Sequence, residues 1–159
     1  MNDHRESRRV WLIRHAKAAE AESDQRDFDR PLTEKGQSQC DPLREWLSDR
    51  VGEREVKALI SPAVRTQQTA DLVLADWFEG PRVPAERIWN ASAGKLTELL
   101  EENAGHLALV GHNPGLEQLQ SMLTGQVVPL PTAGAFELAF DDEGRCLLEA
   151  RFQPSSEST

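Results

Sequence analysis

Short apolar runs alternate with helical patterns along most of this chain, and this alternation limits the folds open to it. The apolar, partly β-branched runs predict buried strands, at 10–13, 56–60, 83–88 and 107–110. Helices are predicted after Thr33, over 62–78, after Ser92 and from Asn113 onward. The last apolar stretches, 135–140 and 146–152, predict a hairpin around an acidic turn. Strands that alternate with helices favour an α/β sandwich with a largely parallel sheet.

Residues at the predicted helix ends support these boundaries. Thr33 and Ser92 are suitable N-caps, and Asn113 followed by Pro114 is typical of an N-cap and a first helical position. Gly80-Pro81 is expected to stop the helix over 62–78.

Length and composition indicate one globular domain. The chain has 159 residues, of which 38% are hydrophobic and 28% charged. We place the domain at 9–152, with flexible tails at 1–8 and 153–159, the first of which holds His4. No apolar run approaches the roughly 18 residues of a membrane span, and the N-terminus lacks a signal-peptide pattern. A cytoplasmic location without membrane attachment is therefore expected, with Cys40 and Cys146 reduced.

The net charge of −9 excludes one class of partner. Nucleic-acid binding needs basic patches that neutralise phosphates, so an acidic chain is not expected to bind nucleic acid. An anion site in this protein must therefore be a local concentration of positive charge.

Polar and basic residues follow three of the predicted strands. These groups are Arg14-His15, Ser61-Pro62-x-x-Arg65 and Gly111-His112-Asn113-Pro114. In open α/β sheets, ligands bind outside the carboxyl ends of the strands, so segments about 50 residues apart are expected to meet in one pocket.

Two histidines and two arginines at such positions point to phosphoryl transfer. Arginine offers a planar fork of donors that stays charged, and helices that begin near Pro62 and Pro114 would add N–H groups. A neutral imidazole is a nucleophile that forms covalent intermediates. A second, protonated imidazole would donate to a phosphoryl oxygen as negative charge develops.

Four motifs together resemble the histidine phosphatase (phosphoglycerate mutase-like) superfamily, and most of all its short SixA-type phosphohistidine phosphatases. They read V-W-L-I-R-H-A-K-A, D-x-D-R-P-L-T-E-K-G, S-P-A-V-R-T-Q-Q-T-A and V-G-H-N-P-G-L, in order within about residues 9–140. The resemblance implies a three-layer α/β/α domain, no metal and no cofactor. It implies that His15 is the nucleophile and that Arg14, Arg65 and His112 hold the phosphoryl group. We place Ala16 and Asn113 beside them as further phosphate contacts.

The chain departs from the larger branch of the family in lacking an obvious general acid. The segment where that acid would stand reads Arg87-Ile88-Trp89-Asn90-Ala91-Ser92, and Glu86 is a weak substitute. General acid help is worth roughly 10²–10⁴-fold for an alkoxide leaving group, whereas a protonated imidazole leaves readily. The sequence therefore favours hydrolysis of phosphohistidine on a protein, such as a histidine phosphotransfer domain in signal transduction.

Several alternatives stay open. One alternative function is a broad phosphomonoesterase for small phosphorylated metabolites. Another is a module that binds phosphohistidine or a phosphoprotein without turnover. A mutase would need insertions that 159 residues hardly accommodate. For three residues two roles stay open: Lys17 touches substrate or is a solvated loop residue, Arg30 lies at the pocket rim or forms a structural salt bridge, and Thr132 lines the site or belongs to a plain turn. Ser61 is expected to bond backbone, and the tryptophans are expected in the core.

Overall fold

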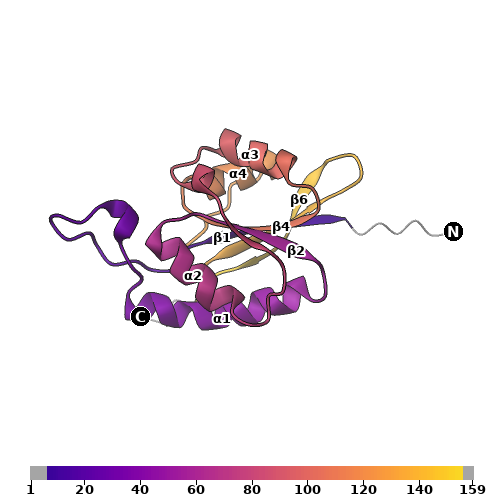
Figure 1. Ribbon diagram of the computed structural model, residues 1–159. Helices are drawn as coiled ribbons and strands as arrows, with labels where there is room; N and C mark the ends of the chain where they lie inside the picture. The colour runs from indigo at the N-terminus through magenta and orange to yellow at the C-terminus, as the bar shows by residue number, and fades with distance from the viewer. Residues whose placement is uncertain (1–6, 156–159) are drawn as a thin grey trace.

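The computed structural model describes residues 7–155; residues 1–6 and 156–159, which belong to the predicted tails and include His4, lie outside this range. Six strands form one sheet in the order β3-β2-β4-β1-β5-β6 (Figure 1). The strands are β1 (Arg8–Arg14), β2 (Val56–Ile60), β3 (Arg82–Pro84), β4 (His106–Gly111), β5 (Ala135–Phe140) and β6 (Cys146–Phe152). The helices are α1 (Glu34–Val51), α2 (Val64–Leu74), α3 (Ala93–Glu102) and α4 (Gly115–Thr124), with 3₁₀ turns η1 (Asp27–Asp29) and η2 (Glu86–Ile88).

The sheet is mostly parallel and is covered by helices on both faces. The four adjacent strands β3, β2, β4 and β1 run parallel to one another, while β5 and β6 add an antiparallel hairpin beside β1. Helices α1 and α2 lie on one face, and α3 and α4 lie on the other (Figure 1). The predicted α/β/α sandwich is therefore confirmed.

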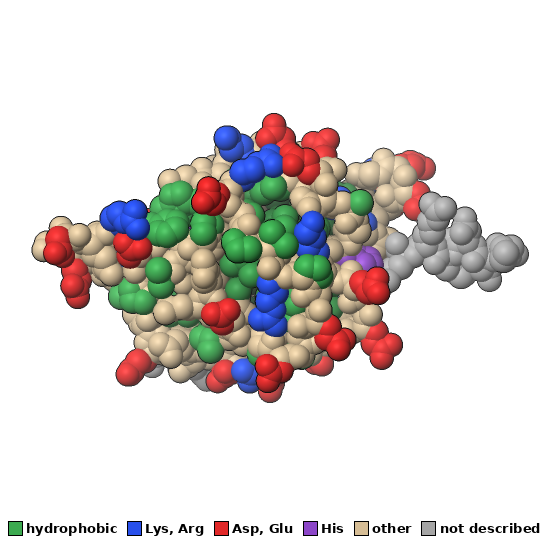
Figure 2. All heavy atoms as spheres, viewed as in Figure 1, with side chains coloured by type: hydrophobic (Ala, Val, Ile, Leu, Met, Phe, Trp, Pro, Cys, Tyr) green, Lys and Arg blue, Asp and Glu red, His purple; other side chains and the backbone are tan. Residues whose placement is uncertain are grey.

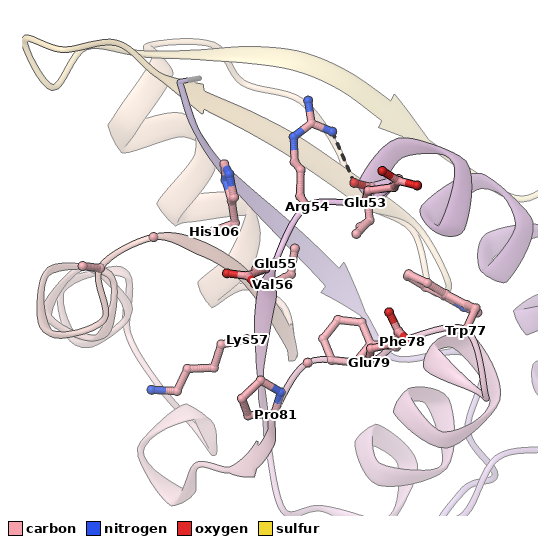
Figure 3. A pocket seen from close by; sticks show the side chains of 15 residues that line it. Glu53, Arg54, Glu55, Val56, Lys57, Trp77, Phe78, Glu79, Pro81 and His106 are labelled. Carbon is pink, nitrogen blue, oxygen red and sulfur yellow. Dashed lines mark hydrogen bonds between the residues drawn. The ribbon is translucent and has the colours of Figure 1, made fainter. Parts of the chain in front are cut away.

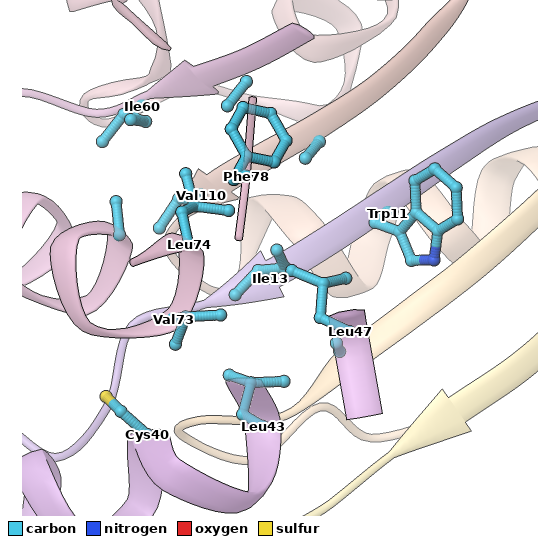
Figure 4. Packing of buried hydrophobic residues seen from close by; sticks show 14 of the residues in the cluster. Trp11, Ile13, Cys40, Leu43, Leu47, Ile60, Val73, Leu74, Phe78 and Val110 are labelled. Atoms are coloured by element: carbon cyan, nitrogen blue, oxygen red, sulfur yellow. The ribbon is translucent and has the colours of Figure 1, made fainter. Parts of the chain in front are cut away.

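Strand β1 shows why this sequence forms a central strand. Trp11 and Ile13 pack under α1 and α2 (Figure 4), whereas Val10 and Leu12 belong to the core under α3 and α4. All four side chains are fully buried. Alternate residues of a strand face opposite sides of the sheet, so a strand between two helical layers must be apolar throughout.

Two predicted helix caps are present. The Thr33 hydroxyl accepts from Gly36 N at 2.9 Å and the Ser92 hydroxyl accepts from Lys95 N at 3.2 Å. Gly36 also allows the start of α1 to pack against the chain that leaves β1, since a Cβ there would lie 2.1 Å from the Lys17 carbonyl oxygen. This contact fixes α1 close to the end of β1.

The structure corrects three boundaries. Helix α2 covers 64–74 instead of 62–78, because Ala75 adopts a positive φ of 44° that ends the helix well before Gly80-Pro81. The strand predicted at 83–88 divides into β3 and η2. Asn113 lies one residue before the N-cap, which is Pro114, although its Oδ1 still accepts from Glu117 N at 3.3 Å.

The surface carries no single basic region on the face shown in Figure 2, where Lys and Arg side chains are scattered among acidic ones. Cys40 is buried and Cys146 partly buried, and both are free thiols. Among residues 7–155, no helix has the length and apolar character needed to span a membrane.

Candidate active site

The carboxyl ends of three neighbouring strands bring the predicted residues together. Arg14 ends β1 opposite Gly111, which ends β4, and Ile60 at the end of β2 lies opposite Val110. His15 and His112 directly follow β1 and β4. Arg65 is the second residue of α2, which begins shortly after β2. The predicted convergence of these segments is therefore present in the fold.

The backbone and ring of His15 are held firmly. His15 N donates to Gly111 O at 3.1 Å, and Ala133 N donates to His15 O at 3.0 Å. The Ala16 carbonyl, 2.7 Å from His15 Nδ1, can only accept, so Nδ1 carries the proton. In the neutral ring the lone pair is then on Nε2, which accepts from Arg65 Nε at 3.3 Å.

The surroundings of His15 favour the neutral ring. Burial, together with the guanidiniums of Arg65, Arg14 and Arg30, lowers the pKa of His15 to about 4, although the hydrogen bond to Ala16 opposes this. A neutral imidazole whose Nε2 lone pair is directed at a guanidinium is arranged as a nucleophile for an anion.

His112 lies beside His15, with ring centroids 5.4 Å apart. Its Nε2 is 2.7 Å from the Ser61 hydroxyl, so Ser61 contacts a side chain where a backbone partner was expected. Burial, His15 and Arg65 lower the pKa of His112 to about 3. Its Nδ1 is buried and has no hydrogen-bond partner in the described part of the chain.

Arg14 leaves a donor without a partner. Its Nη1 donates to Leu130 O at 2.9 Å, whereas its Nε is buried and unpaired within the described residues. Burial lowers the pKa of Arg14 and Glu117 partly offsets this, but a guanidinium stays charged at neutral pH.

Asp27, which the sequence did not single out, binds Arg65 from the loop after β1. Arg65 Nη1 donates to Asp27 O at 2.8 Å and Nη2 to Asp27 Oδ2 at 3.2 Å. Arg30 Nε donates to Asp27 Oδ1 at 2.7 Å. Partial burial works against ionisation, but Arg65 and Arg30 together hold the pKa of Asp27 below its usual value. Asp27 is therefore a carboxylate at neutral pH.

Trp89 was also missed, because the tryptophans were expected in the core. Its ring lies 5.1 Å from the His112 ring in an edge-to-face arrangement, and the Arg65 guanidinium carbon lies 5.3 Å from its centroid. Phe28 packs edge-to-face on Trp89 at 5.1 Å. An apolar residue near a short strand carries no sequence signal that separates a site wall from a core position.

Ala16 and Asn113 have partners other than those expected. Ala16 N donates to Thr69 Oγ1 at 3.0 Å, so its N–H is not free for phosphate. Asn113 Nδ2 donates to Glu117 Oε2 at 2.6 Å and to Leu130 O at 2.9 Å. Ala16 O orients His15, and Asn113 ties down the Leu130 loop that receives Arg14; a direct contact of either residue with phosphate stays a prediction.

The structure shows the surroundings of Arg30, Lys17 and Thr132, for which the sequence left two roles open. Arg30 combines its ion pair with Asp27 and a bond to Ala19 O at 3.1 Å. Lys17 is exposed, and Thr132 lies in a turn that Gly134 N closes onto Pro131 O at 2.9 Å. Among the described residues, no three His, Cys, Asp or Glu side chains are grouped to hold a metal ion.

A hollow of about 670 Å³ lies at the opposite end of the sheet, around the starts of β2 and β4 (Figure 3). Three carboxylates line it, Glu53, Glu55 and Glu79. Lys57 Nζ is bound to Asn103 Oδ1 at 2.8 Å, and His106 Nδ1 accepts from Arg9 N at 3.0 Å. This hollow therefore suits a phosphorylated ligand less well than the site around His15 does.

Comparison with known proteins identifies the family of this chain. Residues 10–108 match the sequence profile of the histidine phosphatase superfamily (branch 1). The chain is 31% identical over 142 residues to an uncharacterised chloroplastic protein of Arabidopsis thaliana. That match covers 81% of this chain and 65% of the relative, so it spans less than two thirds of the relative's length.

An uncharacterised protein of Picosynechococcus is 32% identical over 138 residues, 81% of this chain and 83% of its own length. Among solved structures, the candidate phosphohistidine phosphatase SixA of Agrobacterium tumefaciens is similar, with a TM-score of 0.82 and 28% identity. That similarity covers 94% of this chain and 100% of the other.

Proposed function

Since this chain belongs to the histidine phosphatase superfamily, we propose that it hydrolyses phosphohistidine through a covalent phosphohistidine on His15. The observation that carries the proposal is the tautomer of His15 and the direction of its Nε2 lone pair. Its Nδ1–H is bound to Ala16 O, and its Nε2 lone pair lies 3.3 Å from Arg65 Nε. A phosphoryl group drawn to the guanidinium would thus meet the nucleophile.

The unpaired nitrogens near His15 support an anion as the ligand. Buried polar groups are nearly always hydrogen-bonded, yet Arg14 Nε and His112 Nδ1 have no partner within residues 7–155. If the Ser61 hydroxyl donates to His112 Nε2, the proton of the neutral ring is on Nδ1. Phosphoryl oxygens would then accept from both nitrogens and from Arg65, which stabilises charge in the transition state.

The reaction has two displacement steps. His15 Nε2 attacks phosphorus as the P–N bond to the substrate imidazole breaks, with the electron pair going to the leaving nitrogen, which takes a proton from solvent. Water then attacks phospho-His15, releases inorganic phosphate and restores the Nε2 lone pair. Each step transfers the phosphoryl group in line, with its oxygens held by Arg14, Arg65 and His112.

The preference for phosphohistidine follows from the lack of an acid placed to protonate a leaving group among the described residues of the site. Asp27 is held as a carboxylate by Arg65 and Arg30, and Trp89, not an acid, packs against His112. An alkoxide leaving group without general acid help reacts roughly 10²–10⁴-fold more slowly. An imidazole needs no such help because solvent can protonate it.

The substrate we propose is phosphohistidine carried on a protein, such as a phosphotransfer domain. Loop 15–32 supplies Asp27, Phe28 and Arg30 beside the site and projects from the body of the molecule (Figure 1). Its exposed part, 20–24, lies on the same loop as Asp27 and offers a surface that a macromolecular substrate could contact.

A substrate panel tests this function. We expect kcat/KM for a phosphohistidine protein and for free phosphohistidine to exceed that for phosphoserine by at least about 10²-fold. Equal turnover of phosphoserine would identify a general phosphomonoesterase instead. Tight binding of phosphohistidine without release of phosphate would identify a binding module.

His15→Asn tests the nucleophile, with His106→Asn as its matched control. His15→Asn removes the lone pair at Nε2 and should abolish turnover. His106 lies at the other end of β4, and an Asn oxygen there can still accept from Arg9 N, so His106→Asn should keep turnover. Wild-type rates in His15→Asn would refute the assignment.

A further inference from the structure

The aromatic side chains next to the site have no part in the two displacement steps. Trp89 contacts Arg65 and His112, and Phe28 packs on Trp89 from loop 15–32. Both residues are partly exposed, so the pair reaches the surface of the site. The pair Phe28–Trp89 is called the aromatic wall below.

Trp89 differs from the other three tryptophans in its neighbours. The indole N–H groups of Trp11 and Trp77 are bound, to Glu137 at 3.0 Å and to Val73 O at 2.8 Å. Within residues 7–155 the indole N–H groups of Trp89 and Trp46 make no hydrogen bond, and both residues are partly exposed. Trp46 packs on Phe152, whereas Trp89 packs on the site residues His112 and Arg65.

The aromatic wall lies beside the residues proposed to hold the phosphoryl group, where a leaving group can contact it. In-line displacement places the leaving group on the side of phosphorus opposite the attacking Nε2 of His15. Trp89 contacts Arg65 and His112, the groups proposed to hold the phosphoryl oxygens. Among the described residues, its ring contacts do not include His15. The wall therefore borders the groups proposed to hold the phosphoryl oxygens and makes no ring contact with the nucleophile.

We propose that Trp89, supported by Phe28, is a specificity-determining residue that contacts the leaving group and selects a planar imidazole. This inference rests on the proposed function and names the part of the substrate that the wall recognises. A ring placed against the indole gains edge-to-face or stacked contact, and once protonated it also gains a cation–π attraction. A leaving group without a ring gains neither.

Two substrates that share a P–N bond test the proposal. Phosphohistidine releases an imidazole, whereas phosphoramidate releases ammonia and has no ring. Trp89→Leu should slow both reactions, because Arg65 and His112 lose a packing partner. The ratio of kcat/KM for phosphohistidine to that for phosphoramidate should fall about tenfold.

The matched variants separate ring recognition from bulk. Trp89→Phe keeps an aromatic ring and should hold the ratio within about twofold of wild type. Trp46→Leu removes a tryptophan that packs on Phe152, and it should leave the ratio unchanged. An unchanged ratio in Trp89→Leu would reduce Trp89 to a positioning residue and overturn the inference.

A measurement on the wild type keeps the inference testable if Trp89→Leu does not fold. Phospholysine also has a P–N bond but a flexible, non-planar leaving group. We expect phosphohistidine to be preferred over phospholysine by at least about tenfold, and equal rates would overturn the inference alone. No turnover of phosphohistidine by the wild type would overturn the proposed function, and this inference with it.

Discussion

At the scale of single residues, the site depends on a histidine that stays neutral. Burial and three guanidiniums lower the pKa of His15 to about 4. Above that pH the ring keeps the Nε2 lone pair, and below it protonation removes the nucleophile. The chain has four histidines, so an NMR titration of the ring protons resolves each one. We expect a midpoint for His15 near 4, and a midpoint near the ordinary 6.5 would contradict the assigned environment.

Arg65 is the second residue whose chemistry is specific. Its Nε donates to His15 Nε2, while Nη1 and Nη2 donate to Asp27. The single nitrogen of a lysine ammonium cannot make all three hydrogen bonds in this geometry. Arg65→Lys should lower kcat/KM about 10²-fold or more, as loss of a transition-state donor does. Arg87→Lys, which changes an exposed partner of Glu102, is the control and should behave as wild type. Near-normal turnover in Arg65→Lys would show that charge alone suffices.

At the scale of elements, one buried carboxylate joins β1, β5 and α1. Glu137 on β5 is 1% exposed and binds Arg9 and Trp11 of β1 and Arg50 of α1. Glu137→Ala leaves the guanidiniums without their buried partner and should lower the free energy of unfolding by about 3 kcal/mol. This loss is at the low end of the roughly 3–5 kcal/mol that removal of one partner of a buried ion pair costs, because the Arg50 side chain is 38% exposed.

The matched control is on the neighbouring strand. Glu149 on β6 also pairs with Arg9, but its side chain is 40% exposed. Glu149→Ala should cost less than about 1 kcal/mol in urea denaturation, since exposed ion pairs contribute little. Equal losses for the two variants would show that burial of Glu137 does not matter.

At the scale of the whole molecule, the fold holds two imidazoles neutral that the unfolded chain would protonate. The pKa of His15 is about 4 and that of His112 about 3, against an ordinary value near 6.5. Between about pH 6.5 and 4 the unfolded state binds more protons, so stability is lost as the pH falls. Each histidine lowers the free energy of unfolding by at most about 1.4 kcal/mol for each pH unit of this fall. A His15→Gln/His112→Gln variant should show a shallower loss than wild type in denaturation at pH 6.5 and 5, and parallel curves would contradict this.

Much of the fold was predictable because its signals are local. Buried strands that end in Arg14 and Gly111, and caps such as Thr33, appear within a few residues of sequence. The convergence of the site residues followed from one topological rule for parallel sheets. Asp27 and Trp89 were missed because their roles depend on how loop 15–32 and the segment after β3 fold back onto α2. That packing is long-range, and no local pattern encodes it.

The covalent intermediate is the most direct test of the proposed chemistry. The hydrogen bond from His15 Nδ1 to Ala16 O leaves Nε2 as the reactive nitrogen. The enzyme would be mixed with phosphohistidine, quenched rapidly in alkali, which preserves phosphohistidine, and analysed by ³¹P NMR and peptide mass spectrometry. We predict phosphate on His15, attached to Nε2. Phosphate on Nδ1 or on another residue, or turnover without any phosphoenzyme, would contradict the assignment of His15.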